Sequence, residues 1–157
     1  MAARNVVHGS FTVTRNWPHP PEKVFNAFAD EKAKARWFGG PGGWELLEKR
    51  FDFREGGHEH VAGRHGTGTV SVFDATYHDI VPPKGQEPGR IIYSYVMHLD
   101  GKKISVSQAV IEIRPEGAGT KLVVTERGDF LDGYDDNGSR EHGTNFLMDH
   151  LGKSVGG

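Results

Sequence analysis

The feature that most limits the fold of this sequence is a series of short strand-like runs followed by one long segment with helical spacing. Six runs, separated by turn signals rich in glycine and proline, span residues 44–53, 57–64, 69–81, 90–99, 103–113 and 120–127. The Asp100–Gly101 pair between two of these runs is typical of a tight β-hairpin. The pattern therefore predicts six antiparallel strands.

One more strand and two short helices are predicted before these runs. Residues 9–16 alternate between apolar and polar side chains, and the proline-rich residues 17–21 stop the alternation. Residues 22–38 contain good helix formers, and their apolar pattern is broken near Asp30. Glycine-rich residues 39–43 then separate this helical region from the strands.

The chain ends in a longer helix. Residues 128–138 read as a loop, and Ser139 is expected to cap the helix that follows. An apolar stripe at helical spacing comprises Thr144, Leu147, Met148, Leu151 and Val155. A curled seven-stranded antiparallel sheet around this long C-terminal helix would bury both apolar surfaces. We expect an α+β fold, with two short helices after the first strand, in a single domain over residues 1–157.

Alternation along each strand predicts which side chains face inward. The inward set comprises Phe11 and Val13; Leu47, Phe51 and Phe53; Phe73, Ala75 and Tyr77; Ile91, Tyr93, Tyr95 and Met97; Ala109, Ile111 and Ile113; and Leu122 and Val124. Ser105 and Ser107 have the same parity, and such small side chains are expected to leave space. A cavity between sheet and helix is therefore predicted.

Residues 56–65 (GGHEHVAGRH) have the histidine density of a metal site. His58 and His60 lie two apart in a strand, so they share one face, whereas Val61 and Glu59 share the other. If Val61 is buried, both imidazoles point outward and Glu59 points inward. Zinc bound by these two histidines and His65, with a partner such as His78 or His98, stays an alternative, but we predict no metal site and no cofactor.

Two carboxylates are expected to face the cavity, because Glu59 shares parity with Val61 and Glu126 continues the inward row of the last strand. Such a carboxylate pairs with a cation or has a raised pKa, and either state suits ligand recognition or acid–base chemistry. The alternative is that each lies near water and pairs with an arginine such as Arg54 or Arg15. Trp37 is interpreted as a wall of the cavity mouth or as an ordinary core residue.

Composition limits the partners. The chain has 157 residues, with 19 Lys and Arg against 21 Asp and Glu and no cysteine. Because the basic residues are scattered, we expect neither nucleic acid nor a membrane as a partner. Thiolate chemistry and Cys-ligated metals are excluded. The sequence has neither a run of about 20 apolar residues nor an apolar secretion signal, so a cytoplasmic protein is predicted, as a monomer or homodimer.

Several stretches, in this order and spacing, are similar to a known family. They are FTVTRNWPHPPEKVFNAFAD, RWFGGPGGW, DFREGG, YHDIVPP, RIIYSY and IEIRPEGAGTKLVVTERG. Together they resemble the activator of heat-shock protein 90 ATPase homologue 1-like family, in the START-like (SRPBCC) superfamily. The resemblance implies a helix-grip fold with a deep hydrophobic cavity.

Individual positions also match the family. Trp37 matches its aromatic at the end of the second short helix, Arg54–Gly57 matches its R-P-G-G turn with Glu55 in place of proline, and Pro82–Pro83 matches its strand-ending prolines. Gly143–Thr144 stands where members usually have Gly-Trp, which implies a larger or wetter cavity.

Three functions remain open at this point. The first is binding of a small apolar or aromatic ligand in the cavity. The second is a cavity enzyme with a carboxylate or histidine as general acid or base, and the third is a co-chaperone-like protein interaction. No catalytic residue is assigned. The predicted ligand-binding residues are Trp37, Phe53, Glu59, Tyr77, Tyr93, Tyr95, Met97, Glu126, Thr144 and Met148.

Overall fold

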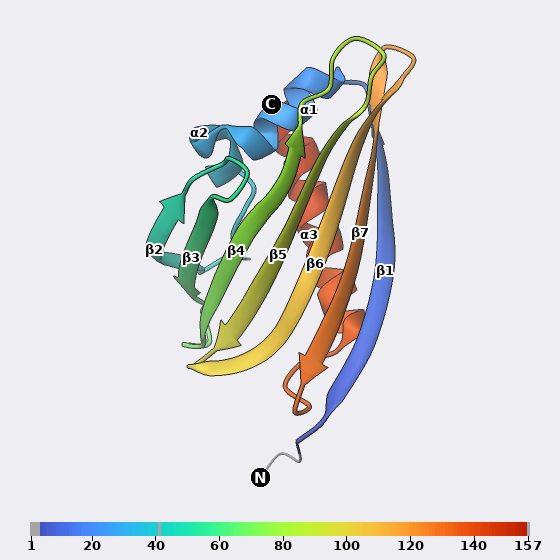
Figure 1. Ribbon diagram of the computed structural model, residues 1–157. Coiled ribbons are helices and arrows are strands. Elements are labelled where there is room, and N and C mark those ends of the chain that lie inside the picture. Colours follow the sequence, from blue (N-terminus) through green and yellow to red (C-terminus); the bar gives the residue numbers. More distant parts are fainter. Residues whose placement is uncertain (1–3, 41, 157) are drawn as a thin grey trace.

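The computed structural model describes residues 4–40 and 42–156, which form one curled antiparallel sheet and three helices (Figure 1). In chain order the elements are β1 (Val6–Trp17), α1 (Pro21–Ala29), α2 (Glu31–Ala35), β2 (Glu45–Phe51), β3 (His58–Arg64), β4 (Val70–Val81), β5 (Gly89–Leu99), β6 (Lys102–Glu116), β7 (Gly119–Leu131) and α3 (Asn137–Gly156). The strand order is β1-β7-β6-β5-β4-β3-β2. Sequence neighbours therefore pair throughout, except that β1 closes onto β7.

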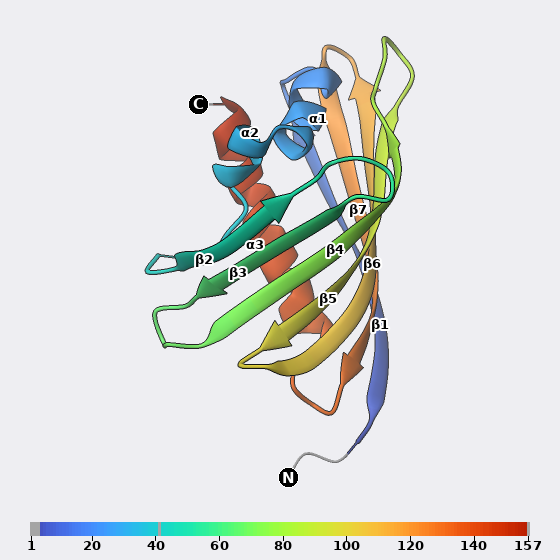
Figure 2. The ribbon, with the colours of Figure 1, turned by 60° about the vertical axis from the view of Figure 1, so that its left-hand side comes forward.

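The sheet curls around α3, and α1 and α2 cover one end of the space between them (Figures 1 and 2). The second view shows β2 and β3 bending away from the other strands toward the side on which α3 lies. The predicted α+β helix-grip architecture, with a seven-stranded sheet and two short helices after the first strand, is confirmed.

The core forms where the inner face of the sheet meets one stripe of α3. On α3 the buried residues are Thr144, Met148, Leu151 and Val155, spaced by four, three and four as a helix requires. The three apolar ones belong to the same hydrophobic cluster as the inward residues of β6 and β7, such as Ile111, Ile113 and Leu122. The inward parity predicted for these strands is confirmed.

Leu47 was predicted to face inward, and this prediction is wrong, because the residue is 38% exposed. The pairing of β2 with β3 shifts between Leu46 and Glu48, so the strict alternation is interrupted at Leu47. Phe51 and Phe53 lie beyond this irregularity, and both pack against the core as predicted.

The ends of β1 and β7 differ from the prediction. β1 begins at Val6, three residues before the predicted start, and β7 continues to Leu131 through residues predicted to be a loop. The two extensions pair with each other, with Val6 opposite Leu131. Backbone hydrogen bonds between the strands therefore set the length of β1 and β7, which apolar alternation did not predict.

The start of α3 also differs, because Asp136 and not Ser139 caps it. The Asp136 carboxylate accepts hydrogen bonds from the backbone N–H (2.8 Å) and the hydroxyl (3.2 Å) of Ser139. The helix therefore begins at Asn137, inside its predicted loop. In the described part of the chain no helix is long and apolar enough to cross a membrane.

Replacing Leu151 by alanine tests the contact between sheet and helix. Leu151 is fully buried, so Leu151→Ala should lower the free energy of unfolding by about 2–5 kcal/mol. The matched change Leu47→Ala, at the exposed position on β2, should cost less than about 0.5 kcal/mol. Urea unfolding measures both, and equal losses would contradict the assigned helix stripe.

Candidate functional site

A cavity of about 390 Å³ lies between the concave face of the sheet and α3. Nine of the ten predicted ligand-binding residues line it. They are Trp37, Phe53, Tyr77, Tyr93, Tyr95, Met97, Glu126, Thr144 and Met148. Glu59 is buried as predicted, but it lines a separate pocket of about 70 Å³ behind Lys34 and Phe38. Strand parity thus gave its direction correctly, whereas the side chains in front of it could not be foreseen from parity.

Aromatic rings from the middle strands form the wall of the cavity. The rings of Phe73 and Tyr95 stack with their centroids 5.1 Å apart, and the ring of Tyr93 lies edge-on to that of Tyr77 at 5.7 Å. Burial raises the pKa of both Tyr93 and Tyr95, so their hydroxyl groups stay protonated and can donate hydrogen bonds.

Trp37 satisfies both interpretations of its role. Its indole Nε1 donates a hydrogen bond to the carbonyl oxygen of Ala27 (2.9 Å), and its ring lies edge-on to Phe28. These contacts hold it in the core, and the same side chain also lines the cavity. The residue therefore anchors α1 and α2 while it presents an aromatic surface to the cavity.

Glu126 is the first of two buried carboxylates, with only 6% of its surface exposed. One carboxylate oxygen accepts a hydrogen bond from Thr144 Oγ1 (2.6 Å), and the other accepts one from the Tyr95 hydroxyl. The suggested pairing with Arg15 is wrong, because Arg15 contacts Asp149 and Asn145 on the flank of α3. Glu126 is therefore held by hydroxyl donors.

Arg140 was missed in the sequence, yet it organises this end of the cavity. Its guanidinium donates hydrogen bonds to the Tyr95 hydroxyl (3.0 Å), to Ser105 Oγ (2.8 Å) and to Asp135 (2.9 Å). Ser105 and Ser107 were predicted to leave space, but the Arg140 side chain fills the space beside them and donates hydrogen bonds to both hydroxyl groups. The available signal was spacing, since Arg140 lies one turn before Thr144 on the buried stripe.

Glu59 is the second buried carboxylate, with 2% of its surface exposed. Its Oε1 accepts hydrogen bonds from Lys34 Nζ and from the Tyr77 hydroxyl, both at 2.5 Å. The suggested pairing with Arg54 is wrong, because Arg54 contacts Asp52 near the surface. Lys34 was missed because the EKAKAR stretch reads as a solvated helix, although Lys34 lies three residues before Trp37 and so shares its face.

Lys34 is buried among aromatic rings. Its Nζ lies 4.5 Å from the ring centroid of Phe38 and 5.4 Å from that of Phe51. Burial lowers the pKa of Lys34, and the Glu59 carboxylate opposes this shift without cancelling it. This amine therefore differs chemically from the lysines at the surface.

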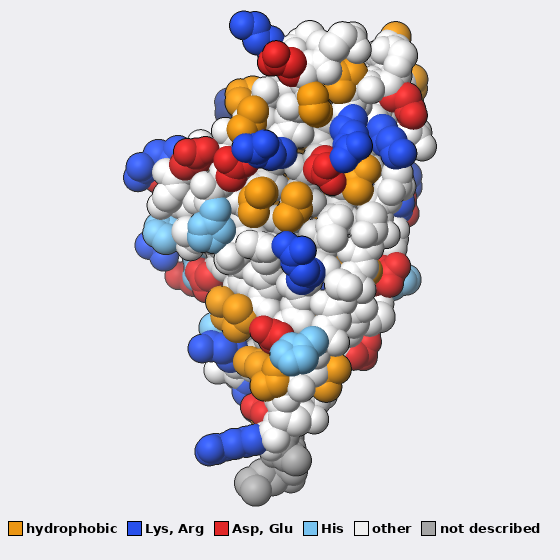
Figure 3. Space-filling view, turned by 45° about the vertical axis from the view of Figure 1, so that its right-hand side comes forward, with side chains coloured by type: hydrophobic (Ala, Val, Ile, Leu, Met, Phe, Trp, Pro, Cys, Tyr) orange, Lys and Arg blue, Asp and Glu red, His pale blue; other side chains and the backbone are white. Residues whose placement is uncertain are grey.

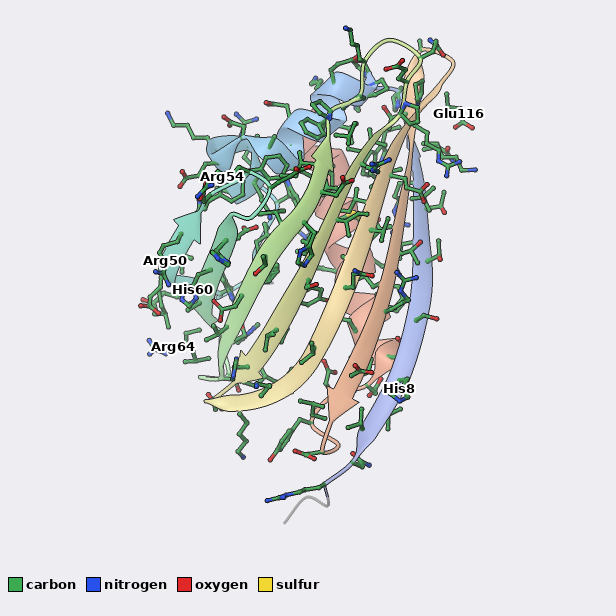
Figure 4. All side chains as sticks on the ribbon, viewed as in Figure 1. His8, Arg50, Arg54, His60, Arg64 and Glu116 are labelled. Carbon is green, nitrogen blue, oxygen red and sulfur yellow. The ribbon has the colours of Figure 1, made fainter. Side chains whose placement is uncertain are left out.

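The histidines of residues 56–65 do not converge. His58 contacts Thr76, His65 contacts Ser71, and His60 lies on β3 (Figure 4) with its Nδ1 2.6 Å from Asp74. In residues 4–40 and 42–156 no three His, Asp or Glu side chains are grouped in a way that could hold a metal ion. The outward direction predicted for His58 and His60 agrees with these partners.

Comparison with known proteins identifies the family of this chain. The family described as "Activator of Hsp90 ATPase homolog 1-like protein" matches residues 18–156. The chain belongs to this family. It is thereby a member of the START-like (SRPBCC) superfamily, whose fold typically binds ligands. The resemblance inferred from the sequence stretches is confirmed.

Solved structures with this fold include two proteins that are each 38% identical in sequence to this chain. A putative uncharacterized protein from Rhizobium leguminosarum is 38% identical, with a TM-score of 0.88 over 98% of this chain and 97% of that one. Protein Mll3558 from Rhizobium loti is also 38% identical, with a TM-score of 0.84 over 96% and 99% of the two chains. An AHSA1-like protein from Aeromonas hydrophila, at 19% identity, covers 94% of this chain and 92% of its own with a TM-score of 0.68, and shows the shared fold alone. No curated protein matches the chain.

The Asp74–His60 contact predicts a pH effect. Its hydrogen bond raises the pKa of His60 above the ordinary value of about 6.5. Because the folded-state pKa is the higher one, the stabilisation is complete below about pH 6.5 and is lost as the pH rises through the folded-state pKa. In an NMR titration, Asp74→Asn should move the pKa of His60 down toward its ordinary value. An unchanged titration would show that this contact does not form in solution.

The Lys34–Glu59 pair makes a prediction about stability. Lys34→Met leaves the Glu59 carboxylate buried without a cation, so the free energy of unfolding should fall by about 3–5 kcal/mol. The double variant Lys34→Met/Glu59→Met should recover most of this loss, because no buried charge remains. Lys32→Met, on the exposed side of α2, is the control and should change stability by less than about 0.5 kcal/mol. Equal effects at Lys32 and Lys34 in urea unfolding would contradict the buried pair.

Proposed function

We propose that this protein binds a hydrophobic or aromatic small molecule in the cavity between the sheet and α3. The observation that carries the proposal is the cavity itself, with a volume of about 390 Å³ and walls of aromatic and aliphatic side chains. Ligand pockets in proteins typically have volumes of about 300–1,000 Å³, with mostly apolar walls and a few polar groups that orient the ligand.

The polar groups favour a ligand with a hydrogen-bond donor or a positive charge at one end. Glu126 accepts hydrogen bonds from two hydroxyl groups, and among the described residues no Lys, Arg or His lies within ion-pair distance of it. A buried carboxylate gains from a cation or a further donor. We therefore propose that the ligand places such a group near Glu126 and its apolar part against Tyr93 and Met97.

The other two functions have different support. A cavity enzyme is favoured by the buried Lys34–Glu59 pair, whose chemistry is taken up below. A co-chaperone-like contact has weaker support, since charged side chains of both signs are interspersed with small apolar groups on the face shown in Figure 3. We further propose that residues 1–157 act as one START-like domain in the cytoplasm, as a monomer or homodimer.

Filling the cavity tests ligand binding. Leu147→Trp adds bulk to a side chain that lines the cavity, so the affinity for the uncharged dye Nile red should fall at least tenfold. Leu47→Trp makes the same change at an exposed position of β2 and should leave the affinity unchanged. Dye fluorescence measures both, and binding should also quench tryptophan emission less in Trp37→Phe than in the wild type.

The same titration has a clear negative outcome. If Leu147→Trp and Leu47→Trp bind the dye equally well, the dye lies outside the cavity and the proposed site is wrong. A separate variant, Glu126→Gln, tests whether this carboxylate recognises a positive charge on the ligand. It should weaken binding of an amine-bearing aromatic probe such as 2-naphthylmethylamine more than binding of naphthalene itself.

A further inference from the structure

Lys34 lies in the wall between the main cavity and the smaller pocket, and it lines both. Its ammonium group has aromatic rings around it and two polar partners, Glu59 and Tyr77, at 2.5 and 3.3 Å. Only 8% of the residue is exposed. The amine is thus screened from bulk water but borders the space in which we propose that a ligand binds.

Stability alone does not explain a lysine in this position. A protein is often as stable, or more stable, when apolar side chains of similar size replace a buried ion pair, because the charged groups lose their hydration on burial. Lys32 on the same short helix and Lys49 on β2 both reach solvent, so α2 does not need Lys34 for solubility. A buried lysine next to a cavity can act as a nucleophile when its amine is unprotonated in a fraction of the molecules.

We propose that Lys34 forms a reversible imine with an aldehyde or ketone group of a hydrophobic molecule bound in the cavity. The inference rests on the proposed ligand-binding function, which it extends by naming a reactive group on the ligand. Glu59 and Tyr77 are the neighbouring acid–base groups, because both contact Lys34 Nζ and the Tyr77 hydroxyl also donates to Glu59 at 2.5 Å.

The steps balance without any further reactant. Lys34 gives one proton to Glu59, and the nitrogen lone pair attacks the carbonyl carbon while the C=O π electrons move to oxygen. Tyr77 donates a proton to that oxygen and regains one from Glu59. Loss of a second nitrogen proton and of the hydroxyl group releases one water as the C=N bond forms. The net change is R₂C=O + Lys–NH₃⁺ → Lys–NH⁺=CR₂ + H₂O, with no oxidation or reduction.

The surroundings of Lys34 favour the first step. Burial lowers the pKa of Lys34, and the positive charge of Lys49 on β2 acts in the same direction. Glu59 on β3 opposes both, yet it is also the acceptor for the proton that must leave. Burial also raises the pKa of Tyr77 on β4, so its hydroxyl stays protonated and can donate to the carbonyl oxygen.

Reductive trapping tests the proposal on the wild-type protein. Incubation with 2-naphthaldehyde and sodium cyanoborohydride near neutral pH converts an imine into a stable amine, which peptide mass spectrometry locates. Lys34 should be modified at least tenfold faster than exposed Lys23 or Lys84. Excess 2-naphthalenemethanol, which has no carbonyl group, should compete for the cavity and slow labelling at Lys34 alone.

Variants separate the chemistry from binding. Lys34→Arg keeps a cation for Glu59 but removes the reactive amine, so total labelling should fall to the level of exposed lysines. Glu59→Gln should slow labelling of Lys34 at least tenfold. Nile red binding with Lys34 labelled no faster than Lys23 would overturn the imine and leave the proposed function standing. Loss of both dye binding and labelling would overturn both, and the wild-type result decides even if a variant does not fold.

Discussion

The contact between one stripe of α3 and the concave face of the sheet holds the two layers of this protein together. Met148, Leu151 and Val155 fill the space at one end of the helix, against the inward residues of β6 and β7. Toward the start of α3 the buried stripe becomes polar, with Thr144 and then Arg140. One helix cannot fill the whole inside of a curled seven-stranded sheet, so the apolar end packs tightly while the space beside the polar end remains a cavity.

The two buried carboxylates show two solutions to the same energetic problem. Removing a carboxylate from water is costly unless hydrogen bonds or an opposite charge replace the lost hydration. Glu59 receives a direct cation from Lys34, together with the Tyr77 hydroxyl. Glu126 receives hydroxyl groups from Tyr95 and Thr144, and Arg140 acts on it through Tyr95. The Glu59 carboxylate is already paired with a cation, whereas the Glu126 carboxylate can accept a further hydrogen bond, and the two carboxylates are therefore assigned different roles.

Membership of the Activator of Hsp90 ATPase homolog 1-like family accounts for the architecture but not for these side chains. The same fold holds many chemistries, so function has to be argued from the site. Here the site combines an aromatic wall, one carboxylate held by hydroxyl groups and one buried lysine, and each of these narrows the class of molecule that would fit. Binding and covalent capture are therefore successive proposals about one cavity, since the second requires the first.

The sequence alone determined the succession of strands and helices along the chain, the buried stripe of α3 and the inward direction of Glu59 and Glu126. Each follows from a local period, two residues in a strand and 3.6 in a helix, which neighbouring residues are enough to reveal. What those carboxylates contact was decided by the tertiary structure. Lys34 is 25 residues from Glu59, and Arg140 is 45 from Tyr95, so no local pattern links them. Leu47 shows the same limit, because the pairing irregularity that exposes it depends on the register of β2 against β3. Local periodicity sets the direction of a side chain, whereas its partners depend on how distant segments pack.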